Sequence, residues 1–365
     1  HFIANYMTDH GGGIQLEDLA SYQAKIRPPV HTTFRGSDVY SIGPPSSGGI
    51  VLCLMLNILE RYDLRREGPA APRTLHLVTE AMRRAFFIRA TRIGDPDFVP
   101  VDSAKLTSKP FAESLAKTIG EQATPSAELA PFPILEVEGD HTTHLSTIDG
   151  QGNAVALTYT LEESYGSKAV VSGAGILLNN EMGDFNLVPG RTDTSGRIGT
   201  LPNLIAAGKR MVSSQTPSIV LKDGVVTLVT GSPGGRTIPN TTLWVILNRL
   251  EFGLAPQSAI DAPRTHHQWF PDRLSIESRF RNDRVIAELE RIGHRIVRSA
   301  AQGDANSIAV DPDTGLRHGI ADRRRSTSKA SGDSASPEIR SRKHAGTRND
   351  RPDSIASPRL IGTPR

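Results

Sequence analysis

Two adjacent threonines between two histidines are the first residues whose types and order suggest chemistry. The stretch GDHTTHLST, residues 139–147, places Thr142 and Thr143 between His141 and His144. A threonine hydroxyl is a weak nucleophile until a base removes its proton. The α-amino group of the same threonine can be that base, but only when the threonine begins a chain. An internal threonine becomes the first residue if its hydroxyl attacks the preceding carbonyl and water hydrolyses the resulting ester.

Thr142 is therefore a candidate nucleophile at a self-cleaving junction, with the scissile bond after His141. An ordinary interpretation stays open, because threonine is also common in β-strands. Thr143 and His144 need no chemical role, since packing and a hydrogen bond account for both residues.

The residues around this junction predict β-hairpins, which would hold the threonine in place. Two alternating runs flank a polar turn at residues 149–153, so the second strand brings Thr160 back toward Thr142. Further hairpins are predicted over residues 30–43, 218–231 and 307–322.

Helical patterns separate these hairpins. Pro44 and Pro45 predict a turn, Gly48 and Gly49 would let the backbone bend tightly, and a buried helix follows. The other predicted helices cover residues 16–25, residues 73–95 with an end near Gly94, a segment from about Thr237 after a glycine-rich loop, and residues 283–293 with a strand after them. Pro131 and Pro133 predict an irregular linker. Hairpins flanked by helices indicate a layered sheet structure.

Bulk properties narrow the class of protein. A chain of 365 residues forms one large domain or two ordinary ones. It has no apolar run of 18 residues, so no membrane-spanning helix is expected. The single cysteine, Cys53, excludes an internal disulfide framework and a cysteine-rich zinc site, and its apolar neighbours indicate core packing. Adjacent histidines on a strand point to opposite faces, so no metal site is expected at His266 and His267.

The two ends of the chain differ from the body. Residues 322–365 contain 11 lysines and arginines against 5 aspartates and glutamates and have few large apolar residues. We expect a disordered basic tail over residues 323–365, either a solvated tail or translation past the true end. Nucleic-acid binding is not expected, because no aromatic residues are interleaved with the charges. The first residues, HFIANYM, start without a methionine, and we expect a fragment or a processed piece.

Five motifs occur in order: PPSSGGI (44–50), DHTTHLSTIDGQGNAVALTYTLEESYGS (140–167), GILLNNEMGDFN (175–186), SSQTPSIVLKDG (213–224) and TGSPGG (230–235). From about Ile3 to Asp322 the chain resembles the γ-glutamyltransferase (γ-glutamyl transpeptidase) family of N-terminal nucleophile hydrolases. The resemblance implies an α+β fold, a four-layer αββα sandwich that is incomplete at the N-terminus. It also implies autocleavage between His141 and Thr142. Residues 1–141 would then be the C-terminal part of a large subunit, and residues 142–322 the small catalytic subunit.

The resemblance also assigns the site residues. Thr142 is the nucleophile, and Thr160 hydrogen-bonds its hydroxyl. A γ-glutamyl group carries an α-ammonium and an α-carboxylate, and each needs a partner when buried. The implied partners are Glu162, Glu181 and Asp184 for the ammonium, Ser213 and Ser214 for the carboxylate, and the N–H groups of Gly234 and Gly235 for the oxyanion of the acyl intermediate.

The activity implied is hydrolysis or transfer of γ-glutamyl groups from glutathione and related amides, with water, an amino acid or a peptide as acceptor. No cofactor and no metal is implied, the two subunits pair after cleavage, and the family suggests a periplasmic or secreted location. One alternative is a β-lactam (glutaryl) acylase of the same superfamily, whose substrate lacks the α-ammonium that three acids would bind. The other is an inactive truncated remnant.

Two departures from the family pattern bear on the site. An arginine that binds the α-carboxylate lies upstream in family members, and no residue here matches it. Residues 186–212 have the spacing of the family's lid loop but contain no aromatic residue, so we expect a less effective lid.

Overall fold

A six-stranded antiparallel sheet forms the centre of the protein. The computed structural model describes residues 1–129 and 142–332, of which His1–Ala330 form one compact unit. The strand order is β1-β2-β7-β8-β12-β13. Three hairpins build this sheet: β1 (Val30–Phe34) with β2 (Ser37–Ser41), β7 (Ser218–Lys222) with β8 (Val225–Thr230), and β12 (Ser307–Val310) with β13 (Arg317–Ile320). All three hairpins predicted for this sheet are confirmed.

The hairpin that carries the threonines lies against this sheet as a separate pair of strands. Strand β3 (Thr143–Ile148) pairs with β4 (Ala154–Tyr159), in the register Thr143↔Tyr159, and contacts β8 and β12. The Asp149 carboxylate accepts hydrogen bonds from the Gln151 and Asn153 amides and closes the predicted turn.

One face of the hairpin packs inward and the other is exposed. His144 and Thr158 are buried, whereas the neighbouring cross-strand pair Leu145 and Leu157 are 53% and 50% exposed.

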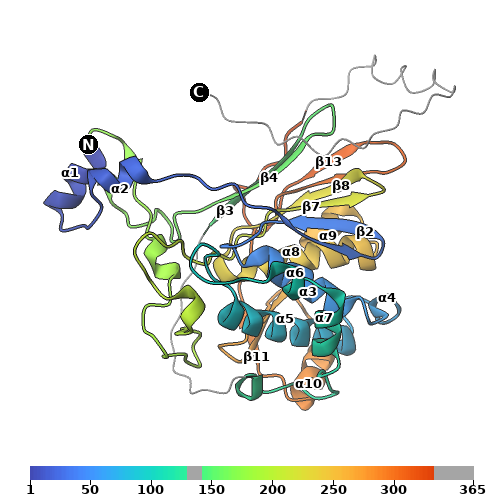
Figure 1. Ribbon diagram of the computed structural model, residues 1–365. Helices are drawn as coiled ribbons and strands as arrows, with labels where there is room; N and C mark the ends of the chain where they lie inside the picture. Colours follow the sequence, from blue (N-terminus) through green and yellow to red (C-terminus); the bar gives the residue numbers. More distant parts are fainter. Residues whose placement is uncertain (130–141, 333–365) are drawn as a thin grey trace. The chain divides into compact units, whose positions relative to one another are not determined.

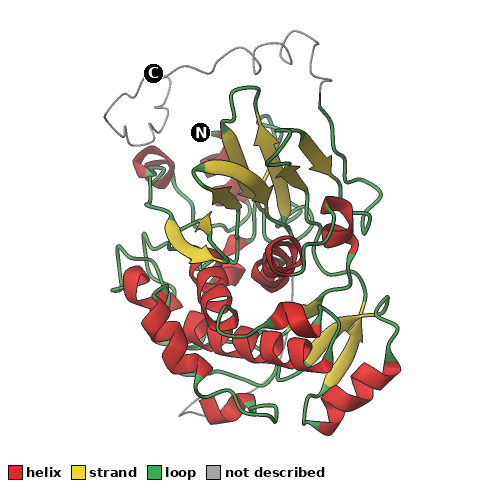
Figure 2. Ribbon diagram, turned by 90° about the vertical axis from the view of Figure 1, so that its right-hand side faces the viewer, coloured by secondary structure: helices red, strands yellow, loops and turns green. Residues whose placement is uncertain are grey.

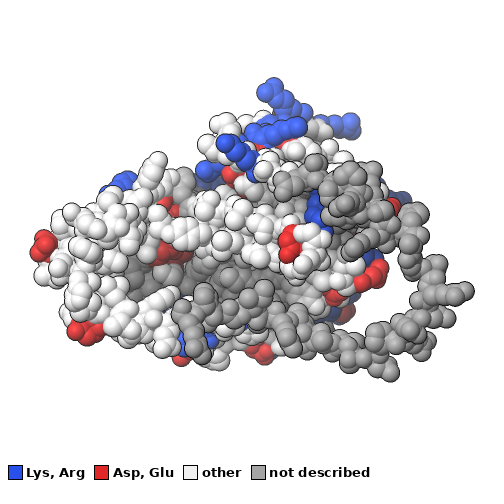
Figure 3. Space-filling view, turned by 90° about the horizontal axis from the view of Figure 1, so that it is seen from above, with Lys and Arg blue, Asp and Glu red and all other residues white. Residues whose placement is uncertain are grey.

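Viewed from above, the molecule presents a largely uncharged face, with lysines and arginines gathered at one edge (Figure 3).

Helices gather on one side of the central sheet (Figures 1 and 2). All residues of α3 (Gly48–Leu59) are buried, Cys53 among them, and this helix contacts α5 (Pro72–Arg92), α8 (Ile238–Ile246) and β1. Burial raises the pKa of the Cys53 thiol to about 12, as expected for a core residue. The buried helix, the long helix and the helix after the glycine-rich loop are therefore confirmed.

Gly48 and Gly49 differ from the expectation. They lie in the first turn of α3 rather than in a bend before it. A Cβ at Gly48 would be 2.1 Å from Thr216 Oγ1 and 2.2 Å from the Gln215 carbonyl oxygen, and one at Gly49 would be 2.1 Å from the Ile42 carbonyl oxygen. These glycines are needed because they allow the helix to approach the backbone of two other segments closely.

A second, three-stranded sheet of β9 (Thr265–His266), β10 (Leu274–Glu277) and β11 (Ile296–Ser299) packs with α10 (Asp283–Arg291), which confirms the predicted helix and strand. The remaining elements are α1 (Phe2–Asp9), α2 (Leu16–Ser21), α4 (Leu64–Glu67), α6 (Ser103–Leu106), α7 (Lys109–Ala116), α9 (Pro256–Asp261), β5 (Val170–Val171), β6 (Ile176–Leu177) and the short helical turns η1 (Ser126–Leu129), η2 (Glu181–Asp184), η3 (Leu201–Asn203), η4 (Gly235–Thr237) and η5 (Leu247–Glu251). In the described residues, no helix is long and apolar enough to cross a membrane.

The packed body extends past Asp322, where the tail was expected to begin. The Arg324 side chain is fully buried and donates to both oxygens of Glu277, at 2.6 and 2.7 Å. It also pairs with Asp322 at 3.2 Å. The expected linker prolines, His141 and residues 333–365 lie outside the described residues.

Candidate active site

A cavity of about 520 Å³ opens beside the threonine hairpin. Residues from five parts of the chain line it: the ends of the hairpin β3–β4, the turn η2, the loop before β7, the turn η4 and the helix α5. The predicted site residues that line this cavity are Thr142, Thr160, Glu162, Asp184, Ser213, Ser214 and Gly235. Glu181 lies next to it in η2, and Gly234 faces a smaller cavity on the other side of the same loop.

The hairpin register brings the two threonines together. Because Thr143 faces Tyr159, the next residues outward on the two strands are Thr142 and Thr160. The Thr142 hydroxyl donates to Thr160 Oγ1 across 3.2 Å. The same oxygen accepts the backbone N–H of Glu162 at 2.8 Å. The hydroxyl of Thr142 is thus held at one end of the cavity.

His144 anchors the hairpin from its buried face. Burial lowers the pKa of His144 to about 4, so the ring is neutral near pH 7. Its Nε2 lies 3.0 Å from Ser146 Oγ, which donates its own proton to the Asn306 carbonyl, so Nε2–H must donate. Its Nδ1 therefore accepts from Thr158 Oγ1 at 2.9 Å. Gly231 makes room for this ring, since a Cβ there would be 2.3 Å from His144 Cε1.

Three carboxyl groups interact at the cavity: Glu162 and Asp184 line it, and Glu181 lies next to it. Burial, followed by the charges of Asp184, Glu181 and Glu163, raises the pKa of Glu162 to about 7. Burial and the charge of Asp184 also raise the pKa of Glu181, and a hydrogen bond from Thr160 opposes that rise. Burial raises the pKa of Asp184, against the charges of Arg89 and Arg236.

These carboxyl groups have unused hydrogen-bonding capacity. Glu162 Oε2 and Glu181 Oε1 are buried without a hydrogen-bond partner among the described residues. Carboxylates that repel one another and lack buried partners are stabilised by a cation that enters between them.

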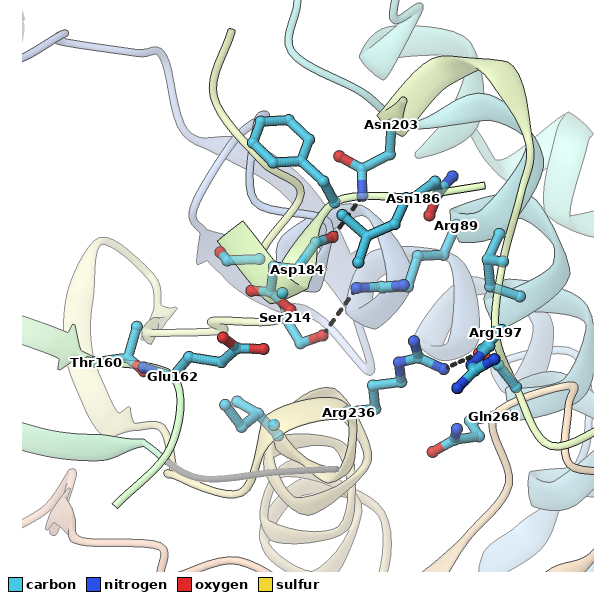
Figure 4. Close-up of a pocket in the computed structure, with 18 of the residues that line it drawn as sticks. Arg89, Thr160, Glu162, Asp184, Asn186, Arg197, Asn203, Ser214, Arg236 and Gln268 are labelled. Atoms are coloured by element: carbon cyan, nitrogen blue, oxygen red, sulfur yellow. Dashed lines mark hydrogen bonds between the residues drawn. The ribbon is translucent and has the colours of Figure 1, made fainter. Parts of the chain in front are cut away.

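The two serines line the same cavity, and Ser214 lies next to the buried Arg89 (Figure 4). The Ser214 oxygen accepts a hydrogen bond from Arg89 Nη2 at 3.1 Å. The Ser213 hydroxyl donates to Ser46 Oγ at 2.9 Å, and Ser47 Oγ donates to the Ser213 carbonyl at 2.7 Å. The PPSSGG motif therefore holds the serine pair from the N-terminus of α3.

The glycine-rich loop ends in backbone conformations that favour glycine. Gly234 has φ +125° and Gly235 has φ +50°. Thr237 Oγ1 donates to the Gly234 carbonyl at 2.7 Å and fixes the loop before α8 begins. This arrangement places Gly235 and the positive end of α8 beside the cavity, whereas Gly234 faces the smaller one.

Several residues that line the cavity were not predicted from the sequence: Arg89, Asn186, Arg191, Arg197, Asn203, Arg236 and Gln268. Arg89 is the most buried arginine of this set, at 8% exposed, and lies on a helix whose other buried residues are mostly apolar. An arginine at an apolar helical position was the signal that could have revealed it.

The segment expected to be the lid does line the cavity. Asn186, Arg191 and Arg197 belong to it. Arg236 Nη1 donates to the Gly196 carbonyl at 2.5 Å, and Asn203 Nδ2 donates to the Asp184 carbonyl at 2.7 Å. Hydrogen bonds to the main chain, rather than an aromatic side chain, connect this segment to the site.

Two groups of histidines have residue types that could bind a metal. His266 contacts Asn240 and Gln268, and His267 contacts Asp272, so each histidine has other partners. The described residues contain one cluster with metal-ligand spacing, His76, Glu80 and His294. Its carboxylate already pairs with Arg83 and Arg84. These two positive charges oppose a cation there.

The fold and the site together define an N-terminal nucleophile hydrolase. A family model described as Gamma-glutamyltranspeptidase matches residues 1–332. The chain belongs to this family, as its motifs indicated.

Named relatives agree with this assignment. The Glutathione hydrolase proenzyme of Escherichia coli (strain K12) is 43% identical over 323 residues, which are 88% of this chain and 55% of the relative. Glutathione hydrolase 2 of Arabidopsis thaliana is 38% identical over 275 residues, covering 73% of this chain and 47% of the relative. The Acylase ACY 1 proenzyme of Pseudomonas sp. (strain SE83) is 33% identical over 312 residues, covering 85% and 53%. The chain spans about half the length of these relatives.

A solved structure supports the fold. The cephalosporin acylase from Bacillus halodurans superimposes with a TM-score of 0.75 at 28% identity, covering 88% of this chain and 56% of that one. The predicted α+β fold class of the N-terminal nucleophile hydrolases is confirmed.

Proposed function

We propose that this chain contributes the catalytic centre of a γ-glutamyl hydrolase and transferase that acts on glutathione and related γ-glutamyl amides. One observation carries the proposal. A single cavity is lined by Thr142, by the acids Glu162 and Asp184 with Glu181 next to them, and by the Ser214–Arg89 pair. A γ-glutamyl group has an electrophilic carbonyl, an ammonium and a carboxylate, and these three features need three such partners.

The reaction would begin with cleavage between His141 and Thr142. The new α-amino group of Thr142 takes the proton of its own hydroxyl, and the oxygen attacks the γ-carbonyl of the substrate. The N–H groups of Gly234 and Gly235 would stabilise the oxyanion that forms. The intermediate collapses to a γ-glutamyl ester of Thr142, and the leaving amine takes the proton. Water, an amino acid or a peptide then attacks this ester and regenerates the hydroxyl.

The carboxyl groups distinguish this proposal from the acylase alternative. A glutaryl substrate has no α-ammonium, so it would leave Glu162, Glu181 and Asp184 repelling one another around an apolar methylene. An ammonium would instead lower their pKa values toward the ordinary range and ionise all three. The three acids therefore favour a γ-glutamyl substrate.

Cleavage and turnover test the proposal together. In a polypeptide that contains residues 1–365, a small chain starting Thr-Thr-His should appear, and γ-glutamyl-4-nitroanilide should be hydrolysed at about 1–10³ per second. Thr142→Ala should remain one chain without activity. Thr143→Ala is the matched control, because that side chain is exposed, and it should be cleaved normally. N-terminal sequencing that finds another junction, or cleavage that persists in Thr142→Ala, would contradict the proposal.

A further inference from the structure

Arg89 is a buried cation that lines the cavity. It projects from α5 between Asp184 and Ser214 (Figure 4). Its Nε donates to Ser47 Oγ at 2.9 Å, and its Nη2 donates to Ser214 Oγ at 3.1 Å. The residue is thus connected to two segments that are far from it in the sequence.

The hydrogen bond to Ser214 decides which way that hydroxyl points. A serine hydroxyl has one proton and two acceptor positions, whereas an arginine can only donate. Ser214 must therefore accept from Arg89, and its own proton is directed elsewhere. Because Ser214 lines the cavity, that proton is available to an acceptor bound there. Ser213 differs, since its proton is donated to Ser46.

The positive charge of Arg89 also acts on the carboxyl group of Asp184. The charged residues around Asp184 are the acids Glu162 and Glu181 and the arginines Arg89 and Arg236. Burial raises the pKa of Asp184. The positive charges of Arg89 and Arg236 oppose this rise, and Arg89 has the larger effect on the pKa.

Ser47 holds the Arg89 guanidinium in the position from which it interacts with Asp184 and Ser214. Its oxygen accepts from Arg89 Nε and its proton goes to the Ser213 carbonyl, so α3 and α5 hold one another through the serine segment. With one nitrogen tied to Ser47 and another to Ser214, the guanidinium cannot rotate away from Asp184 without breaking a hydrogen bond.

We propose that Arg89 is a positioning residue, which aims the Ser214 hydroxyl at the substrate carboxylate and keeps Asp184 charged for the substrate ammonium. This inference rests on the proposed function. It assigns to one side chain of this chain the coupling between the two halves of γ-glutamyl recognition.

Three anilides separate the two effects. γ-Glutamyl-4-nitroanilide has both charged groups, 4-aminobutyryl-4-nitroanilide lacks the carboxylate, and glutaryl-4-nitroanilide lacks the ammonium. For Arg89→Met we expect kcat/KM on the γ-glutamyl substrate to fall by about 10- to 100-fold near pH 7. The acid limb of the profile of kcat/KM against pH should move to higher pH for the two substrates that carry an ammonium. For the glutaryl substrate this limb should stay in place.

The conservative variant and a double variant refine this test. Arg89→Lys retains the charge, so its acid limb should stay near that of the wild type, while KM rises for substrates with a carboxylate. In an Asp184→Asn background, Arg89→Met should no longer move the limb. Arg84→Met is the matched control: Arg84 is 1% exposed on the same helix and contacts Glu80 and Thr118 instead of the cavity. It should lower thermal stability without moving the limb.

The outcomes are separable. The proposed function is overturned, and this inference with it, if two results occur together. The wild-type protein does not turn over the γ-glutamyl anilide, and the Thr142→Ala variant does not bind L-glutamate in calorimetry. A wild-type protein that turns over, together with an Arg89→Met variant whose pH limb and substrate ratios are unchanged, overturns the role of Arg89 alone. A limb that moves equally in Arg84→Met also overturns it, because the effect would then be a general consequence of losing a buried arginine.

Discussion

At the scale of single residues, the site concentrates charge where folding alone would avoid it. Glu162 illustrates this, because it adopts φ +72° and has a buried oxygen without a partner. Both features cost free energy in the folded protein. Such costs are expected where a ligand, rather than the protein, provides the missing partner.

Glu162→Gln should therefore stabilise the empty protein, with a gain that grows as the pH rises above about 4.5. The folded-state pKa is about 7, above the ordinary value, so ionisation in the unfolded state penalises folding increasingly from about pH 4.5 to pH 7. With allowance for solvent screening, we expect a gain of about 2 °C in Tm at pH 8 and none at pH 4.5. Calorimetry at the two pH values measures it. Glu290→Gln, on an exposed residue of α10, should change Tm at neither pH, and a gain at pH 4.5 would show that charge is not the cause.

Asp184→Asn should separate substrates by their ammonium. Asp184 interacts with the neighbouring acids and with the arginines Arg89 and Arg236, and a buried charge that loses its partner costs about 3–5 kcal/mol. We expect KM for γ-glutamyl-4-nitroanilide to rise far more than KM for glutaryl-4-nitroanilide, in steady-state kinetics on the same preparation. Equal losses on both substrates would show that Asp184 does not face the ammonium.

At the scale of elements, the site depends on contacts that join hairpins, helices and the C-terminal segment. Helix α3 approaches Gln215 and Thr216 through Gly48, which positions the loop that carries Ser213 and Ser214. The C-terminal segment makes a comparable contact elsewhere. Arg324 and Arg264 form a buried network with Glu277 and Asp322, between β10 and the end of β13.

A chain that ends at Asp322 should be less stable than one that ends at Gly332. The shorter chain loses Arg324 and leaves two buried carboxylates with one arginine, at a cost of about 3–5 kcal/mol. Chemical denaturation compares the two chains. Arg324→Met in the longer chain should show the same loss, and Glu277→Gln added to it should recover part. Equal stability of the two chains would mean that this network contributes nothing.

At the scale of the whole molecule, buried histidines connect stability to pH. Burial lowers the pKa of His144 and His267 to about 4 and that of His294 to about 3. His76 Nε2 lies 2.9 Å from the Gly120 carbonyl oxygen, and His76 Nδ1 lies 2.9 Å from His294 Nε2. The rings of His144, His267 and His294 are therefore neutral in the folded protein near pH 7.

Stability should fall as the pH drops from about 6.5 toward 4. The unfolded chain binds protons on these histidines in that range and the folded chain does not, so acid favours unfolding. His294→Gln should reduce the slope of unfolding free energy against pH by up to about 1.4 kcal/mol per pH unit. Denaturant unfolding at several pH values gives this slope. The exposed His318→Gln is the control, and an unchanged slope in His294→Gln would contradict the assignment.

Local patterns in the sequence determined the four hairpins and the main helices of this protein. Alternation and turn residues predicted the hairpins of β3–β4, β7–β8 and β12–β13, because a strand's period and a tight turn depend on neighbouring residues. The order of the motifs predicted the family and a set of site residues, seven of which line one cavity. Each of these inferences uses residues that are adjacent in the chain or arranged in a known order.

Only the tertiary structure decided which distant residues meet. Arg89 and Ser214 are 125 positions apart, and no local period records that they share a hydrogen bond. Gly48 was expected to allow a bend and instead allows a close approach to Gln215. Arg324 was expected in a disordered tail and instead pairs with Glu277, 47 positions away. The physical reason is common to all three: side-chain contacts depend on how the layers pack, and packing is a property of the whole chain rather than of any segment of it.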